Sequence, residues 1–479
     1  MYAAFIIRSR GVSRVVDVKV RGAPLTAMSR GLDEIRGELG IPTEFPPEVV
    51  AAAEAAAHRA SGSEHVDRTD RRFVTLDPSS SVDLDQAFDI EIAGDDIVLH
   101  YAIADVGWFV RPGDPLDVEA FERGVTVYLP DQRSTLYPTV LSEGAASLLP
   151  DVDRPAVVFT VRVDPAGRPL LDGAERAIIR NRAKLAYGTV RPGELPDGFA
   201  ELYRRITAAE IERGAPRVEF PEQEIERRDD GSFELTFRPR VESEEQNASM
   251  SLATNMAVGA ALYDAGTGLF RVMPEVDARR HRRLKHSARA FGLDWPEGVS
   301  LDAFERSLPR DDPRTSAFLI AVRRAAGGAS YAPFDPDQRP WHSAVAATYA
   351  QATAPLRRLQ DRYVIEAALA IVNGRPVADE VAAAFEALPV AMAAADGRAN
   401  RAERLALDLA EAVCLAGHEG DIFGAVVVDE GEWGVEVQIA RPAVLTRITA
   451  RGVDPGDDLR VRLVAVDVER RDIRFERVS

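Results

Sequence analysis

Apolar positions recur first at helical and then at strand spacing along the chain. The pattern predicts a helix over Met28–Leu39, and Pro47 opens an alanine-rich helix that we expect to end near Gly62. From Arg72 onward, alternating or continuous apolar runs predict strands in FVTLD, AFDIEI, IVLHYAIADV and AVVFTVRV. Helical and strand patterns both continue to about residue 375, and we expect an α+β protein.

The last hundred residues change from helix to strand. Residues 378–416 carry a long helical pattern, and several alternating strands follow from Phe423. So many short strands in a short segment predict a small closed β-barrel. We therefore expect a small, mainly helical N-terminal region over residues 1–70, a mixed domain over 71–415 and a barrel over 421–479.

Composition and charge restrict the class of protein. The formal net charge is −18, which argues mildly against a protein that coats nucleic acid over its whole surface, although a basic channel stays compatible with it. Cys414 is the only cysteine and lies in an apolar run, as expected for a buried thiol in a reducing cytoplasm. No stretch approaches the ~20 apolar residues of a membrane span, and the N-terminus shows no secretion signal.

Three carboxylates follow the first predicted strand, in DPSSSVDLDQA. Asp77, Asp83 and Asp85 (the carboxylate cluster) share this short loop, and Asp105 ends another apolar strand. Magnesium takes oxygen ligands and needs only a few carboxylates together with substrate phosphate. The residues alone leave two interpretations open, a magnesium site and a solvated acidic turn.

Several motifs, in order, resemble the RNB catalytic domain of the ribonuclease II and ribonuclease R family. RRFVTLDPSSSVDLDQA is similar to its metal-binding segment, ASMSLATNMAVGAAL to its core helix, ATYAQATAPLRRLQD to its late TSPIRRYxD motif, and RANRAERLALD to the helix before its C-terminal OB-fold. The resemblance covers about residues 65–479. The segment before it is too short for the family's two N-terminal cold-shock barrels.

The resemblance implies a fold and an activity. The fold would be mixed sheets and helices around a central RNA channel, followed by an OB-fold barrel. The activity would be processive hydrolysis of single-stranded RNA from the 3′ end to nucleoside 5′-monophosphates. Mg²⁺ would be the cofactor, with Mn²⁺ able to substitute, and no organic cofactor or membrane would be involved.

Residue by residue, the resemblance assigns a metal site and a catalytic group. Asp77, Asp83 and Asp85 match three of the family's four active-site aspartates, and Gln86 stands at the fourth, where an amide oxygen can ligate metal without charge. Arg357 matches the arginine that faces the scissile phosphate. Asp83, Asp85 and Arg357 are therefore the expected catalytic residues.

The resemblance also implies an RNA-binding set. Tyr128 and Phe220 match aromatic residues that stack on bases, and Tyr187 and Glu403 match residues near the RNA end, with Arg358 as a further contact. Ala248 and Ser249 stand where the family has a Glu pair, so one contact to the ribose is either lost or supplied by Glu244 or Glu245.

Basic side chains gather in two further places. Residues 276–292 hold five arginines, one lysine and two histidines, which suits either a solvated helix face or a wall that follows RNA phosphates. The barrel segment contains Trp433 and Phe423 together with several arginines, a mixture that suits single-strand binding; these arginines are Arg441, Arg447, Arg451, Arg460 and Arg462.

Three functions compete on the sequence alone. The first is the magnesium-dependent exoribonuclease. The second is an RNA-binding regulator of the same fold that has weak or lost catalysis because of Gln86. The third, a magnesium-dependent phosphohydrolase for small molecules, is disfavoured by the stacking aromatics and the basic segments.

Overall fold

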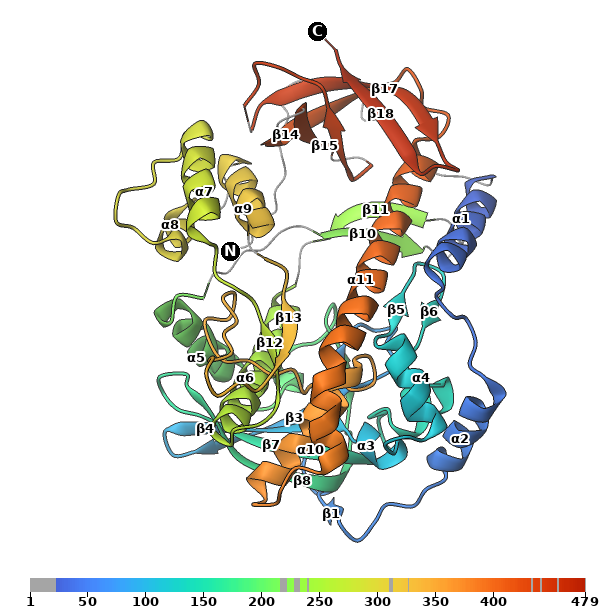
Figure 1. Cartoon of the computed structure of the whole chain (residues 1–479), viewed down its shortest axis with the longest axis vertical. Helices are drawn as coiled ribbons and strands as arrows, with labels where there is room; N and C mark the ends of the chain where they lie inside the picture. The colour runs from blue at the N-terminus through green and yellow to red at the C-terminus, as the bar shows by residue number, and fades with distance from the viewer. Residues whose placement is uncertain are drawn as a thin grey trace.

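The structure is a computed structural model that describes residues 23–215, 222–227, 233–238, 241–309, 313–325, 327–431, 434–439, 442–454 and 456–478. A mixed body carries an upright helix, and a β-barrel sits at the far end of that helix (Figure 1). The expected α+β class and the C-terminal barrel are confirmed. Phe220, Trp433 and Arg441 lie outside the described residues.

The N-terminal helices are α1 (Ala23–Leu39) and α2 (Pro47–Ala57). Both were expected, and Pro47 occupies the first turn of α2, where its missing N–H costs nothing. The second helix nevertheless ends five residues before Gly62. Arg59 donates hydrogen bonds to the carbonyls of Trp108 and Phe109, which draw the chain onto another part of the body.

The body is built on a five-stranded sheet of order β1-β8-β7-β4-β3, antiparallel except for the β1–β8 pair. The interior strand β4, between β7 and β3, is buried along nearly its whole length, as its continuous apolar run predicts. It ends at Ala104, before the expected end, because Asp105 accepts a hydrogen bond from Trp108 N at 3.2 Å and caps the next helix. The strands are β1 (Val66–Asp67), β3 (Gln86–Ala93), β4 (Asp96–Ala104), β7 (Asp153–Val163) and β8 (Pro169–Arg180).

Two helices pack on this sheet and hold the later part of the chain against it. α6 (Glu242–Asp264) contacts β7 and β8, and α10 (Leu359–Val372) contacts β8 and α6. Gly259 of α6 allows a close approach, because a Cβ there would lie 2.9 Å from Ala350 N. The buried Asn255 of α6 then accepts a hydrogen bond from Ala352 N at 2.9 Å, which fixes the chain leading to α10.

α11 (Asp379–Leu415) confirms the long helix expected over residues 378–416 and connects the body to the barrel (Figure 1). The barrel sheet has the order β16-β15-β14-β17-β18, and β16 also lies against β18. Its strands alternate buried and open residues, as expected when one face forms a core. They are β14 (Ile422–Gly431), β15 (Gly434–Ile439), β16 (Val444–Ile448), β17 (Asp458–Asp467) and β18 (Asp472–Arg477).

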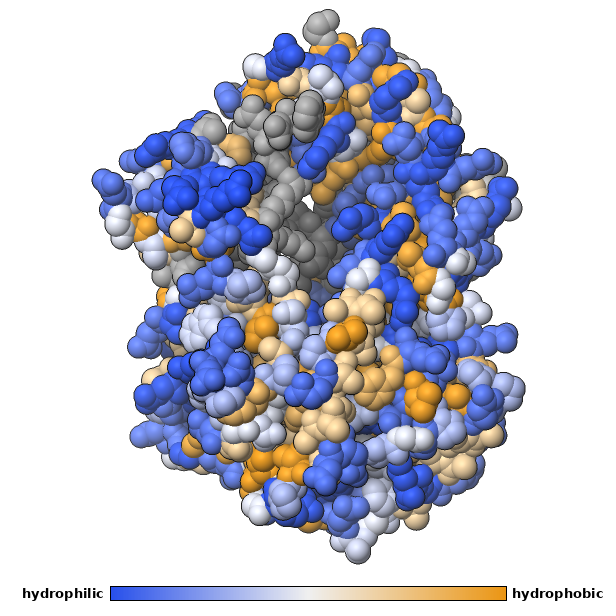
Figure 2. Space-filling view, in the orientation of Figure 1, coloured by the Kyte–Doolittle hydropathy of each residue, from blue (hydrophilic) through white to orange (hydrophobic). Residues whose placement is uncertain are grey.

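A separate lobe of three helices lies between β12 and β13 in the chain and has its own small core around Leu284, Phe304 and Phe318. Its helix α7 (Ala278–Ala290) carries the basic segment, and Arg279, Arg282 and Arg283 are exposed on it. The lobe shows a strongly hydrophilic surface (Figure 2). The other helices of the lobe are α8 (Leu301–Ser307) and α9 (Pro313–Ala325).

Short elements complete the described chain. They are β2 (Thr75–Asp77), α3 (Val106–Phe109), α4 (Pro115–Arg123), β5 (Val127–Tyr128), β6 (Arg133–Ser134), the π-helix Leu141–Ala145, β9 (Lys184–Ala186), the 3₁₀ turn Pro192–Glu194, α5 (Phe199–Glu212), β10 (Glu222–Arg227), β11 (Phe233–Arg238), β12 (Leu269–Val272) and β13 (Ser330–Pro333). Among the helices in the described ranges, none is long and apolar enough to cross a bilayer.

Candidate active site

The loop that carries the carboxylate cluster is anchored by strand pairing and by hydrogen bonds. Asp77 ends β2, which pairs in parallel with β9. Leu84 is completely buried, and its backbone N donates to Ser147 Oγ at 2.9 Å, while that hydroxyl donates to Val82 O at 2.7 Å. The buried leucine between Asp83 and Asp85 therefore fixes the position of both carboxylates.

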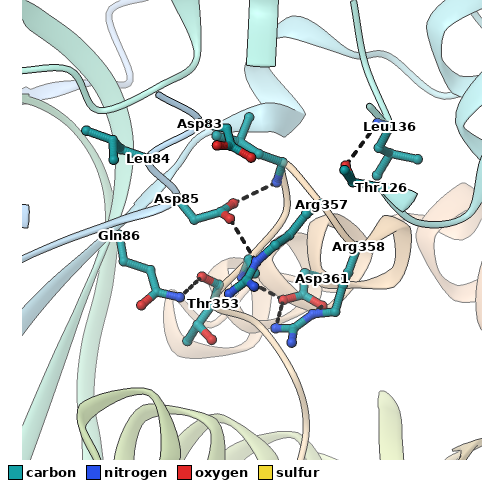
Figure 3. Close-up of polar contacts among 12 residues, drawn as sticks. Asp83, Leu84, Asp85, Gln86, Thr126, Leu136, Thr353, Arg357, Arg358 and Asp361 are labelled. Atoms are coloured by element: carbon teal, nitrogen blue, oxygen red, sulfur yellow. Dashed lines mark hydrogen bonds and ion pairs between the residues drawn. The ribbon is translucent and has the colours of Figure 1, made fainter. Parts of the chain in front are cut away.

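The turn before α10, which is distant in the sequence, contacts this loop. Leu356 N donates to Asp85 Oδ1 at 2.8 Å, and Arg357 Nε lies 3.3 Å from Asp85 Oδ2 (Figure 3). Asp85 is buried, whereas the Arg357 side chain is 46% exposed. The arrangement holds one face of Arg357 on Asp85 and leaves the rest of its guanidinium open to a ligand.

Burial dominates the protonation of two cluster members. It raises the pKa of Asp85 to about 7, against the opposing effect of Arg357 and of the Leu356 amide. Burial also raises the pKa of Asp77 to about 6, with Arg357 again opposing and the charge of Asp83 adding to the rise. Burial therefore disfavours the charged forms of Asp77 and Asp85 in the absence of a bound cation.

Asp83 faces a short hairpin. Arg133 Nη1 lies 2.7 Å from Asp83 Oδ1, and Tyr128 Oη donates to Asp83 Oδ2 at 3.4 Å. Tyr128 and Arg133 are opposite each other in the β5–β6 pair. Tyr128 is 49% exposed, and burial of its hydroxyl end, with only partial opposition from Arg357, raises the pKa of the phenol. Its ring thus lies accessible beside the cluster, and its hydroxyl stays protonated.

Gln86 is the first residue of β3 and is held by hydrogen bonds. Its amide nitrogen donates to Thr353 O at 2.6 Å (Figure 3). Its amide oxygen accepts from the hydroxyls of Tyr101 and Ser251, the latter at 3.2 Å. The ligand role expected of Gln86 stays a prediction, and in the structure its oxygen already has two protein partners.

Comparisons with known proteins identify the family of this fold. Residues 65–373 match the RNB domain, and residues 421–478 match the RNase II-type exonuclease C-terminal S1 domain. The chain belongs to the RNB family. A relative, Ribonuclease R 1 of Lactococcus lactis, is 26% identical over 447 residues, which cover 86% of this chain and 54% of that protein. The chain therefore spans about half the length of this curated relative.

Solved structures share the fold. Mycoplasma genitalium RNase R in complex with ribose-methylated single-stranded RNA matches with a TM-score of 0.84 at 18% identity, over 94% of this chain and 78% of that chain. Yeast Ssd1, described as a pseudonuclease, matches with a TM-score of 0.66 at 16% identity, over 91% of this chain and 58% of that chain. At these identities the likeness establishes the fold alone.

Of the expected RNA-binding residues in this RNB domain, Tyr128 and Tyr187 lie at the cluster. The backbone N of Tyr187 donates to Asp77 O at 3.2 Å, and its hydroxyl accepts from Asn247 Nδ2 at 2.9 Å. Burial raises the pKa of the Tyr187 phenol, and the charge of Asp77 adds to the rise. Glu403 lies exposed on α11, and none of the described contacts joins it to the cluster.

Arg358 has a different environment from its neighbour Arg357. It points inward and forms a two-pronged pair with Asp361, at 3.0 and 2.6 Å, and Asp361 also accepts from Ala354 N at 2.7 Å (Figure 3). This pair fixes the turn that presents Arg357. Arg358 thus stabilises the turn that carries Arg357, and its expected contact with RNA stays a prediction.

Asp105 does not join the cluster, contrary to its expected place as a fourth carboxylate. It is buried, caps α3, and pairs with Arg176 at 2.8 Å and with His65 at 3.3 Å. Burial alone would raise its pKa, but these partners lower it. The sequence showed that Asp105 ends an apolar strand, but it did not reveal these two partners.

Sequence reasoning overlooked three supporting residues. Arg133, Tyr101 and Ser251 contact Asp83 or Gln86, and only Arg133 had a local signal. Pro130 and Asp131 form a turn between two strand-like pairs, which places Arg133 opposite Tyr128. Glu244 and Glu245, which were expected to compensate for Ala248 and Ser249, instead accept from Val241 N at 2.9 Å and Tyr203 Oη at 3.1 Å.

The donor set of the cluster fits a hard divalent cation in its chemistry. Carboxylate oxygens are the ligands that Mg²⁺ prefers. A bound cation would offset the cost of burying the charged forms of Asp77 and Asp85, which is the cost that raises their pKa values. Arginines currently balance Asp83 and Asp85. Within the described ranges, no three His, Cys, Asp or Glu side chains are already arranged around a common metal position.

Proposed function

We propose that this protein is a metal-dependent exoribonuclease that shortens single-stranded RNA from its 3′ end and releases nucleoside 5′-monophosphates. The observation that carries the proposal is the meeting of Asp85 with Arg357, beside Asp77, Asp83 and the exposed ring of Tyr128. Membership in the RNB family and the matched S1 domain support the choice of RNA as substrate.

The chain's own residues divide the work at the scissile phosphate. Asp77, Asp83 and Asp85 would hold Mg²⁺ or Mn²⁺. When bound, the metal supplies a Lewis acid that activates the attacking water and offsets charge on the phosphate. The open side of Arg357 donates hydrogen bonds to phosphate oxygens, and the Arg358–Asp361 pair keeps that side chain in place.

Binding without base preference needs a stacking surface and cations. Tyr128 offers an exposed ring next to Asp83, and stacking on an aromatic ring is tolerant of base identity. The exposed arginines of α7 offer contacts to phosphates farther along the strand. Together they let one active site act on successive nucleotides of any sequence.

A second candidate is an RNA-binding regulator with lost catalysis. The observation that favours it is Gln86, whose neutral amide is occupied by Tyr101, Ser251 and Thr353, so only three carboxylates remain for a metal. One assay separates the two candidates. Uniformly labelled poly(A) is incubated with the protein and Mg²⁺ or Mn²⁺, and the products are resolved by chromatography.

The exoribonuclease predicts labelled adenosine 5′-monophosphate that disappears with excess chelator. Intact RNA that comigrates with the protein would support the regulator. Activity that persists in chelator would exclude the metal-dependent mechanism.

A further inference from the structure

Arg133 bridges the carboxylate cluster to an acidic residue outside it. Its Nη1 lies 2.7 Å from Asp83 Oδ1, and its Nη2 lies 3.0 Å from Glu143 Oε1. We propose that Arg133 is a positioning residue that acts as a displaceable counter-cation for Asp83, with Glu143 as the partner that retains it when a metal ion takes its place. The inference rests on the proposed function, because it assigns Asp83 to the metal site.

The hairpin fixes the backbone of Arg133 and leaves its side chain partly exposed. Leu129 N donates to Gln132 O at 3.3 Å, which closes the turn and places Arg133 opposite Tyr128. The Arg133 side chain is 29% exposed, whereas Asp83 is 11% exposed. The guanidinium therefore reaches the cluster from its open side and can withdraw along the same path.

A cavity that Arg133 and Glu143 line, and Asp83 does not, gives the guanidinium space to withdraw. It has a volume of about 500 Å³, and Arg133, Glu143, Gln132, Val140 and Glu54 contribute to its walls. Glu143 lies in the middle of the π-helix Leu141–Ala145, on the wall of the same cavity, so it can keep its pair with Arg133 when the contact with Asp83 opens. Arg133 would remain paired at every stage, and no buried charge would be left alone.

The shared bridge makes a signed prediction about cation affinity. A guanidinium on Asp83 opposes a second cation there, while Glu143 draws the guanidinium away. Removing the arginine should therefore strengthen metal binding, and removing the charge of Glu143 should weaken it. Loss of local structure would weaken metal binding in both cases, so opposite signs separate the electrostatic role from a merely structural one.

The test is a double-mutant cycle read by Mn²⁺ binding to the RNA-free, full-length protein, followed by the electron paramagnetic resonance signal of free Mn²⁺. We expect Arg133→Gln to lower the Mn²⁺ dissociation constant by at least about threefold and Glu143→Gln to raise it by at least about threefold. In the double variant, the effect of Glu143→Gln should vanish. The matched control is Arg162→Gln on β7, which removes a partly exposed ion pair with Asp172 and should leave Mn²⁺ binding unchanged.

Each outcome decides a different statement. Equal Mn²⁺ affinity in all variants, or weaker affinity in both single variants, would overturn the role of Arg133. If wild type still degrades RNA with metal in that case, the proposed function survives and only this inference fails. If wild type binds no Mn²⁺ and degrades no RNA, the metal-dependent function and the inference fail together. Should Arg133→Gln not fold, Arg133→Met removes the same charge and should likewise lower the Mn²⁺ dissociation constant; a raised constant in that variant would overturn the role of Arg133.

Discussion

Asp85 and Arg357 form an ion pair at 3.3 Å, between a buried carboxylate and a guanidinium that stays half exposed. The pair joins the loop after β2 to the turn before α10, and the Leu356 amide reinforces it. One partner is thus oriented by the protein while the other can still reach a ligand.

Tyr128 should contribute through its ring. Tyr128→Ala removes the exposed platform beside Asp83, so short RNAs should bind more weakly, by about 1–3 kcal/mol, and the final product should be longer. Tyr128→Phe keeps the ring and loses only a 3.4 Å hydrogen bond, so it should behave like wild type. Gel analysis of the end product and fluorescence anisotropy with short oligonucleotides measure both effects. Equal values for Ala and wild type would make Tyr128 a packing residue.

The stability of the metal-free protein should depend on pH through Asp85. Its pKa is about 7 in the folded protein and about 3.9 in an unfolded chain, so the native state binds more protons between pH 4 and pH 7. The free energy of unfolding should therefore fall as pH rises through this window, with a contribution on the order of a few kcal/mol. Asp85→Asn removes this contribution.

Urea unfolding in chelator at pH 5 and pH 8 measures it. Relative to wild type, Asp85→Asn should be more stable at pH 8 than at pH 5. An identical difference at the two pH values would mean that Asp85 does not titrate in this range.

The basic face of α7 should capture RNA by charge. Changing Arg279, Arg282 and Arg283 to Gln removes three exposed cations from a lobe with its own core, so folding should be preserved. RNA affinity should fall, and the slope of log affinity against log salt should shrink by about 2, because each phosphate contact contributes ~0.7. Binding measured across a salt series tests this, with Arg162→Gln as the control. An unchanged slope would leave α7 as a solvated helix face.

Removing the barrel is a poor test of RNA binding. Phe423 and Phe475 belong to the same hydrophobic core as Met28 of α1 and Leu409 of α11, so truncation after α11 would expose apolar surface. A substitution of the exposed Arg460 of β17 instead removes a cation from the barrel and leaves this shared core intact.

Gln86 should stabilise the fold around the site through the hydrogen bonds of its side-chain amide. Gln86→Ala leaves the Tyr101 hydroxyl and Thr353 carbonyl without this partner, so the free energy of unfolding should fall by about 1–3 kcal/mol. Thermal unfolding of the metal-free variant measures the loss. Unchanged stability would contradict the supporting role. A metal titration of RNA decay answers the separate question: a raised metal requirement in Gln86→Ala would show that residue 86 also reaches the cation.

The sequence predicted the carboxylates of the site because they share one loop after a strand. The local pattern picked out Asp77, Asp83 and Asp85, although it did not separate a metal site from a solvated turn. The helix over 379–415 and the barrel strands needed only periodicity. The motif resemblance, in turn, was required to connect Arg357 with that loop, since their contact crosses most of the domain.

The parts that escaped prediction depend on tertiary partners. Asp105 ends an apolar strand like a site carboxylate, but it pairs with Arg176 and His65. The hydrogen bonds that the Gln86 oxygen accepts from Tyr101 and Ser251 could not be seen in the sequence either, and its ligand role stays a prediction. Arg358 could not be told from Arg357 in the sequence, although one pairs with Asp361 and the other faces the cluster. Periodicity contains no information about which partner a polar side chain finds.

The most direct measurement of the central claim uses one RNA oligonucleotide labelled at either end, with wild type and Asp85→Asn. Asn keeps an oxygen for the Leu356 amide and loses the charge that pairs with Arg357, so the fold should persist while catalysis falls by about a hundredfold or more. With metal, wild type should release the 3′ label at once as a mononucleotide and convert the 5′-labelled RNA into progressively shorter products. Asp85→Asn should bind both RNAs and degrade neither. Release of the 5′ label first, or full activity in Asp85→Asn, would contradict the account.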